Sequence, residues 1–95
     1  MAKGYLVAHI RVHDKEAFEE FKQMSGAAIK AHTGNVLVRN PTPDHREGDA
    51  QGLAIVIEFE SIAAARAFYE SDAYTEARGV REKISDTDLI LVEGL

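Results

Sequence analysis

The chain has 95 residues, of which 45% are apolar and 28% charged, with no cysteine and a net charge of −5 at neutral pH. This composition predicts one globular domain over residues 1–95 and excludes a disordered chain, a disulfide framework, a zinc-thiolate site and a cysteine nucleophile. The acidic balance, without a basic block, argues against nucleic acid as a partner.

The first fourteen residues, MAKGYLVAHIRVHD, carry charges through an apolar run that is too short for a signal peptide. No later stretch approaches the length of a membrane span. We therefore expect a cytoplasmic protein that has no membrane partner.

The first predicted strand is Tyr5–Val12, where side chains alternate between two sides as they do in a strand. One side is wholly apolar and consists of Leu6, Ala8, Ile10 and Val12. Asp14 is a typical N-cap, and apolar residues then recur at helical spacing to about His32, with Gly34 as the stop signal.

A second short strand is predicted at Asn35–Asn40, because prolines follow it at once and cannot donate to a sheet ladder. The polar residues 41–52 then form a long connection to a third strand, Leu53–Phe59. Its alternation places Ile55 and Ile57 on one face and Ala54, Val56 and Glu58 on the other.

Ser61 is expected to cap a second helix, which breaks at Ser71 and Asp72 and restarts through Tyr74 to Arg78, before Gly79. The last strand is predicted at Asp88–Glu93. The order is therefore strand, helix, strand, strand, helix, strand. It fits an α+β ferredoxin-like sandwich, with four antiparallel strands and two main helices on one face.

The second face of this sheet is also apolar, since it carries Val7 and Val56, and the run Leu89–Val92 shows no polar side at all. An exposed apolar face of this size indicates an interaction surface. We infer a symmetric homodimer formed through this face. In the alternative, residues 41–52 fold over the face, but that segment is polar.

Short segments along the whole chain resemble one known family. They are Gly4-Tyr5, Val38-Arg39, Glu47-Gly48, Ile57-Glu58-Phe59, Ser61, the run AARAFY at residues 64–69, Ser71, Tyr74, Arg81 and residues 91–94. In their order and spacing they are similar to the domain of unknown function 1330 family, within the dimeric α+β barrel superfamily.

This resemblance implies a ferredoxin-like protomer whose sheet pairs with that of a second protomer into a barrel. Relatives in the wider superfamily include cofactor-independent monooxygenases, muconolactone isomerase-like enzymes, haem-degrading or haem-peroxidase proteins and regulatory ligand-binding domains. Because one fold hosts these different functions, it does not choose among them.

Alternation places His9 and Arg11 with Glu58 on the second face, which is the expected barrel interior. The facing of Arg39 depends on the register of its strand. Charges enclosed in an apolar interior have perturbed proton affinities suited to acid-base chemistry or to holding an anion. Alternatively, Glu58 neutralises Arg11 or Arg39 in a structural ion pair.

Further candidates for ligand binding lie at the junctions of strands and helices and in the long loop. Tyr69, Tyr74 and Arg81 have side chains that can line a pocket mouth, and the resemblance covers the last two. Tyr69 is alternatively a core residue, and Arg81 belongs alternatively to a solvated helical face. Glu47 lies in the loop, whose acidic and histidine residues lack a metal-ligand spacing, so we expect no metal site.

These residues support three hypotheses. The first is an enzyme without a cofactor, acting on a small hydrophobic, aromatic or carbonyl compound, with His9 or Glu58 as base and Arg39 or Arg11 stabilising an oxyanion. The second is a non-catalytic dimer that binds a small ligand in a stress or regulatory setting. The third is a structural association module.

Overall fold

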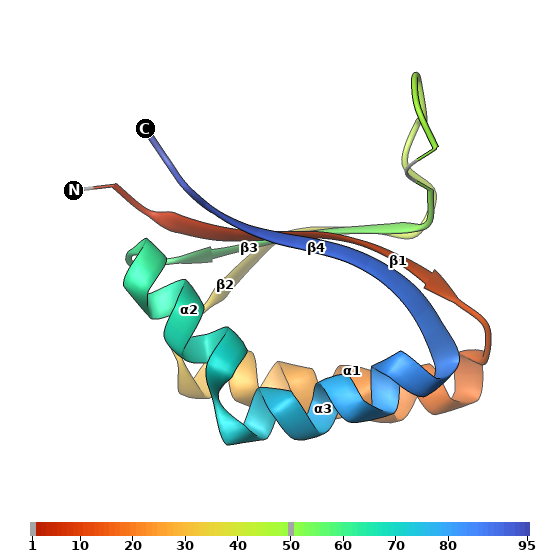
Figure 1. Ribbon diagram of the computed structural model, residues 1–95, viewed down its shortest axis with the longest axis horizontal. Helices are drawn as coiled ribbons and strands as arrows, with labels where there is room; N and C mark the ends of the chain where they lie inside the picture. Colours follow the sequence, from red (N-terminus) through yellow and green to blue (C-terminus); the bar gives the residue numbers. More distant parts are fainter. Residues whose placement is uncertain (1, 50) are drawn as a thin grey trace.

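The computed structural model describes residues 2–49 and 51–95, and Met1 and Ala50 lie outside the described residues. In chain order the elements are β1 (Gly4–Val12), α1 (Lys15–Ala31), β2 (Asn35–Asn40), β3 (Leu53–Phe59), α2 (Ile62–Glu70), α3 (Asp72–Ile84) and β4 (Ser85–Glu93). The strands form one antiparallel sheet in the order β2-β3-β1-β4. All helices lie on one side of it, which we call the inner side (Figure 1). The predicted ferredoxin-like α+β fold is confirmed.

The first helix begins where the sequence predicts, because the Asp14 side chain accepts hydrogen bonds from the backbone of Glu16 and Ala17. At its end the left-handed residue is Thr33, with φ 53°, and not Gly34. Gly34 is required for a different reason. A Cβ there would lie 2.8 Å from the Phe59 ring, so only glycine allows this close approach.

The expected break after α2 is confirmed at Ser71, whose hydroxyl accepts from the Tyr74 amide at 3.2 Å and caps α3. The expected helix end before Gly79 is wrong, since α3 continues to Ile84. Tyr74, Ala77 and Arg81 form its buried stripe. Packing of that stripe outweighs the weak helix propensity of one glycine.

The last strand also begins earlier than expected, at Ser85 rather than Asp88. The first residues of β4 are polar, and their acidic side chains form ion pairs with basic side chains of β1 and of the residue that follows it. Asp88 lies 3.1 Å from the Arg11 guanidinium, and Asp86 lies 3.1 Å from the His13 ring. Backbone pairing with β1 therefore extends the strand where side-chain alternation gives no apolar signal.

The core lies between the inner face and the helices, and its largest fully buried side chains are Phe59 and Phe68. Their ring centroids are 5.0 Å apart, and Phe68 also lies 4.6 Å from the Tyr74 ring. Burying one such side chain contributes about 1.5–3 kcal/mol. This aromatic cluster fixes α2 and α3 against the sheet.

The outer face of the sheet, opposite the helices, remains apolar and uncovered by the described residues. Val7 of β1 lies across from Val56 of β3 and Ile90 of β4. Ile90 is 56% exposed and Val92 is 38% exposed, while Leu89 and Leu91 point inward and are half-buried. The pairing of β4 with β1 thus assigns alternate residues of Leu89–Val92 to the inner and outer faces, although all four side chains are apolar.

A bulge in β2 decides where Arg39 points. Val36 pairs with Ile57 and Val38 with Val56, so the register shifts by one residue between them. Arg39 then pairs with Ile55 and shares the inner face with Val36, instead of being out of phase with it.

None of the described helices combines the length and hydrophobicity needed to cross a bilayer.

Replacing Gly79 by Ala tests the position of this residue inside α3. The site is exposed and a Cβ there meets nothing within 4 Å, so we expect the free energy of unfolding to rise. The expected gain is about 0.5–1 kcal/mol, as for glycine in other helix interiors. Urea denaturation measures it.

Gly4→Ala is the matched control, because a Cβ at Gly4 would collide with the Ser61 carbonyl and should lower stability. An unchanged or lower stability of Gly79→Ala would contradict a continuous α3.

Candidate functional site

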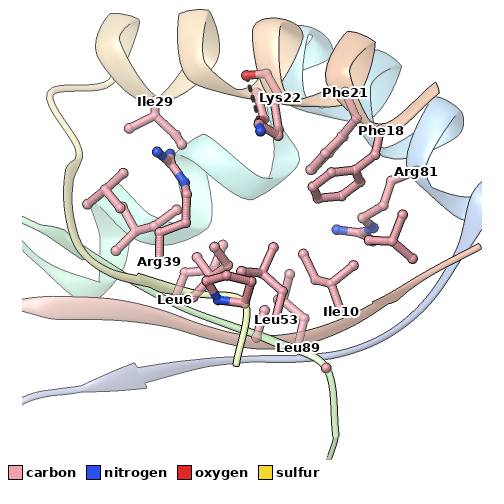
Figure 2. Close-up of a pocket in the computed structure, with 18 of the residues that line it drawn as sticks. Leu6, Ile10, Phe18, Phe21, Lys22, Ile29, Arg39, Leu53, Arg81 and Leu89 are labelled. Carbon is pink, nitrogen blue, oxygen red and sulfur yellow. Dashed lines mark hydrogen bonds between the residues drawn. The ribbon is translucent and has the colours of Figure 1, made fainter. Parts of the chain in front are cut away.

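A cavity of about 580 Å³ lies between α1 and the inner face of the sheet. Figure 2 shows its two walls, with α1 above and the strands below. The sheet contributes Leu6, Ala8, Ile10, Leu53, Ile55, Ile57 and Leu89, and α1 contributes Phe18, Phe21, Ser25 and Ile29. Small side chains at Ala8 and Ser25 leave space between layers that large residues would otherwise fill.

The charged residues that line this cavity are mostly basic, namely Arg11, Lys15, Lys22, Arg39 and Arg81, against Glu19. Glu19 pairs with Lys22 at 3.0 Å, and Arg11 pairs with Asp88 at 3.1 Å. Within residues 2–49 and 51–95, Lys15, Arg39 and Arg81 have no carboxylate partner within 4.0 Å. A chain of net charge −5 therefore places uncompensated positive charge around an apolar cavity.

Arg81 is the most unusual of these cations because only 5% of it is exposed. Its Nη1 donates to the Tyr74 hydroxyl at 2.6 Å, while its buried Nε finds no acceptor in the described part of the chain. The guanidinium lies 5.7 Å from the Phe21 ring centroid and 5.9 Å from that of Tyr74. Such cation–π contacts contribute about 0.5–2 kcal/mol each. Burying a charge costs several kcal/mol, so the site is only partly compensated.

Tyr74 is held in place by the Ser71 cap and by the aromatic cluster. Burial of the ring raises the pKa of its phenol above the usual value of 10.0, and the neighbouring Arg81 opposes the rise. The phenol is therefore protonated at neutral pH. Tyr74 can donate a hydrogen bond to a group in the cavity while it accepts one from Arg81.

The outer face holds a different group of candidates. The Tyr5 hydroxyl donates to the Glu58 carboxylate at 3.2 Å, and both residues are half-buried. Partial burial, with the hydrogen bond and the charge of Glu58, raises the pKa of Tyr5. His9 lies four residues after Tyr5 on the same face of β1, between Ala54 and Asp88 on the neighbouring strands.

The structure therefore separates the predicted catalytic residues. His9 and Glu58 lie on the outer face as expected, but Arg39 lies on the inner face and lines the cavity. The sheet stands between them, so the described protomer does not bring the three residues together. Arg11 reaches the cavity and is bound to Asp88.

Of the predicted ligand-binding residues, Arg11, Tyr74 and Arg81 line the cavity. Tyr69 does not, and its hydroxyl accepts from Arg78 at 2.8 Å. Glu47 is exposed on the segment of residues 41–49, which projects away from the sheet (Figure 1).

Helix α1 contributes Lys15, Phe18 and Lys22 to the cavity lining, and none of these was predicted from the sequence as a site residue. The sequence pattern that indicates this contribution is the helical spacing of the charged residues at positions 15, 19 and 22, along the edge of the apolar stripe of the helix. Nowhere in the described ranges do three or more histidine or acidic side chains gather as metal ligands would.

The sequence of residues 3–95 matches the model of a family described as a domain of unknown function, DUF1330. The chain belongs to the DUF1330 family. No curated protein sequence matches this DUF1330 domain.

Solved structures similar to this DUF1330 domain share its fold. A protein of unknown function from Rhodopseudomonas palustris has a TM-score of 0.77 at 18% identity, covering 99% of this chain and 83% of its own. A dimeric ferredoxin-like protein of unknown function from Thermobifida fusca has a TM-score of 0.70 at 14% identity, covering 99% and 92%. SnoaB, a cofactor-independent oxygenase from Streptomyces nogalater, has a TM-score of 0.68 at 16% identity, covering 97% and 92%.

Replacing Tyr74 by Phe tests the buried contact with Arg81. The guanidinium loses its acceptor, so we expect the free energy of unfolding at pH 7 to fall by about 1–3 kcal/mol. Urea denaturation measures the loss.

The same variant should also change the stability at alkaline pH. Because folding raises the pKa of Tyr74, the unfolded state loses this proton first, and wild-type stability falls as the pH rises above about 10. Tyr74→Phe lacks this contribution and retains Tyr5, so its stability should fall less steeply between about pH 9 and 11. Equal slopes for the two proteins would show that Tyr74 titrates alike in the folded and unfolded states.

Proposed function

We propose that this DUF1330 domain is a homodimer that binds a small, largely apolar compound in the cavity beneath α1. The observation that carries the proposal is the cavity itself, of about 580 Å³, with apolar walls and a few polar groups at its ends. Small-molecule sites in proteins typically have about 300–1,000 Å³ and this kind of lining. A core packed only for stability would hold few voids larger than a water molecule.

The outer face supports the homodimer. Val7, Val56 and Ile90 form a continuous apolar row across three strands, and no described helix covers it. Contiguous apolar surface of this kind marks an interface. Dimeric relatives such as the Thermobifida fusca protein share the fold, which adds to this support. A second sheet would also enclose His9 and Glu58.

Replacing Ile90 by Lys tests the dimer. An ammonium group at this position would be buried without a partner in each protomer, so we expect a dissociation constant at least a hundredfold higher. Light scattering at micromolar concentration should give twice the protomer mass for the wild type and the protomer mass for the variant.

Ala63→Lys on the exposed side of α2 is the control, and should remain dimeric. A monomeric wild type, or an Ile90→Lys variant that still dimerises at the wild-type concentration, would refute an interface through this face.

Catalysis without a cofactor is the second candidate function. The cofactor-independent oxygenase SnoaB shares the fold, and Tyr74 places a neutral phenol beside a cation in an apolar cavity. In the cavity, Lys15, Arg39 and Arg81 are the cations without a carboxylate partner among the described residues, and they are available to stabilise an oxyanion. His9 or Glu58 would act as base only on a compound held at the outer face, between the two sheets of a dimer.

Both functions predict that the cavity binds a neutral aromatic probe such as 2-naphthol. We expect saturable binding by fluorescence titration, and its loss in Ile55→Trp, where the larger ring occupies the cavity. Ala63→Trp adds the same ring on an exposed helix surface and should bind the probe as the wild type does. Equal binding by both variants would place the probe elsewhere.

The same mixture distinguishes the two functions. An oxygenase consumes the bound phenol together with dissolved oxygen, whereas a binding protein returns the probe unchanged. An oxygen electrode measures the consumption of dissolved oxygen, and chromatography shows whether the recovered probe is unchanged.

A further inference from the structure

We infer that the natural ligand of this cavity is an amphipathic carboxylate, with its carboxylate against Arg81 and its apolar body along the sheet. This inference rests on the proposed function, since it assumes that the cavity beneath α1 holds a ligand. Beyond the proposed function, the inference specifies that the ligand is negatively charged and that Arg81 is the residue that selects this charge.

The first step concerns the missing counter-charge of Arg81. Only 5% of the Arg81 residue is exposed, no carboxylate of the described residues lies within 4.0 Å of its guanidinium, and its buried Nε has no acceptor among them. A guanidinium keeps its charge when buried. Tyr74 contributes a neutral oxygen and Phe21 a ring face, and neither carries the negative charge that a buried cation needs.

The second step explains why the anion belongs at Arg81 and not at the other free cations. Arg39 and Lys15 are exposed to water, so an ion pair there gains little. The same charge beside Arg81 lies in a medium of low dielectric constant, where the attraction is several times stronger. Arg81 is therefore the position at which a ligand's charge changes affinity most.

The third step concerns the rest of the ligand. Figure 2 shows Arg81 and Arg39 at opposite ends of the cavity, with Leu6, Ile10 and Leu53 between them. A small inorganic anion would leave this apolar wall unused. A compound with an aromatic or aliphatic body covers the wall while its carboxylate accepts from Arg81 and from the Tyr74 phenol.

The test compares 2-naphthoate with its uncharged isostere 2-naphthamide, by fluorescence titration and by the shift in thermal midpoint. We expect the wild type to bind 2-naphthoate at least tenfold more tightly and to be stabilised more by it. Arg81→Met should reduce this preference by roughly tenfold to a hundredfold, the usual effect of losing a hydrogen bond to a charged group. Arg81→Lys should restore part of it.

Arg66→Met is the control, because it removes one positive charge from the exposed surface of α2 and should leave the preference unchanged. The unliganded Arg81→Met protein should be as stable as the wild type or more stable, since a buried charge without a counter-ion is removed. A merely structural arginine would instead lower stability and leave the preference intact, and that result overturns the inference.

If a variant does not fold, the ratio of the wild-type affinities for 2-naphthoate and 2-naphthamide still tests the inference. Binding of 2-naphthamide as tight as that of 2-naphthoate overturns the carboxylate assignment and leaves the proposed function standing. Failure of 2-naphthol, 2-naphthamide and 2-naphthoate to bind at all overturns both. Tighter binding of 2-naphthoate that Ile55→Trp abolishes supports both.

Discussion

The sheet of this protein has apolar side chains on both faces, and most other features of the structure follow from that constraint. Helices α1, α2 and α3 cover only the inner face, where Leu6, Ile57 and Phe59 are buried. The outer row through Val7, Val56 and Ile90 is left for another surface to cover. Because side chains alternate with a period of two, each strand serves both purposes at once, and a slip of one residue would exchange them.

The cover on the inner face is incomplete, and the cavity is the consequence. Aromatic packing of Phe59, Phe68 and Tyr74 fixes α2 and α3 closely against the sheet, while the small side chains of β1 and α1 leave space between α1 and the sheet. Arg81 enters this space from the buried stripe of α3. A protein selected for stability alone would place an apolar residue there. The buried charge of Arg81 therefore links the packing of α3 to the ligand that we propose for the cavity.

Much of this fold could be predicted from the sequence, because its signals are local. Alternation located β1 and β3, and Asp14, Ser61 and Ser71 marked helix starts through their capping hydroxyl or carboxylate groups. The predicted helix end before Gly79 was wrong, because the weak helix propensity of glycine counts for less than the packing of the buried stripe that extends α3. The polar start of β4 was missed because its pairing with β1 is not visible in side-chain pattern.

The candidate site required the tertiary structure, and Arg39 and Arg81 show why. The sequence by itself determined the order of the elements, the two-sided sheet and the facing of His9 and Glu58, because each depends on residues close together in the chain. The facing of Arg39 was decided by a bulge in pairing between strands, and the burial of Arg81 by contact of α3 with α1 and the sheet. Both depend on contacts between distant segments, which only the folded chain brings together.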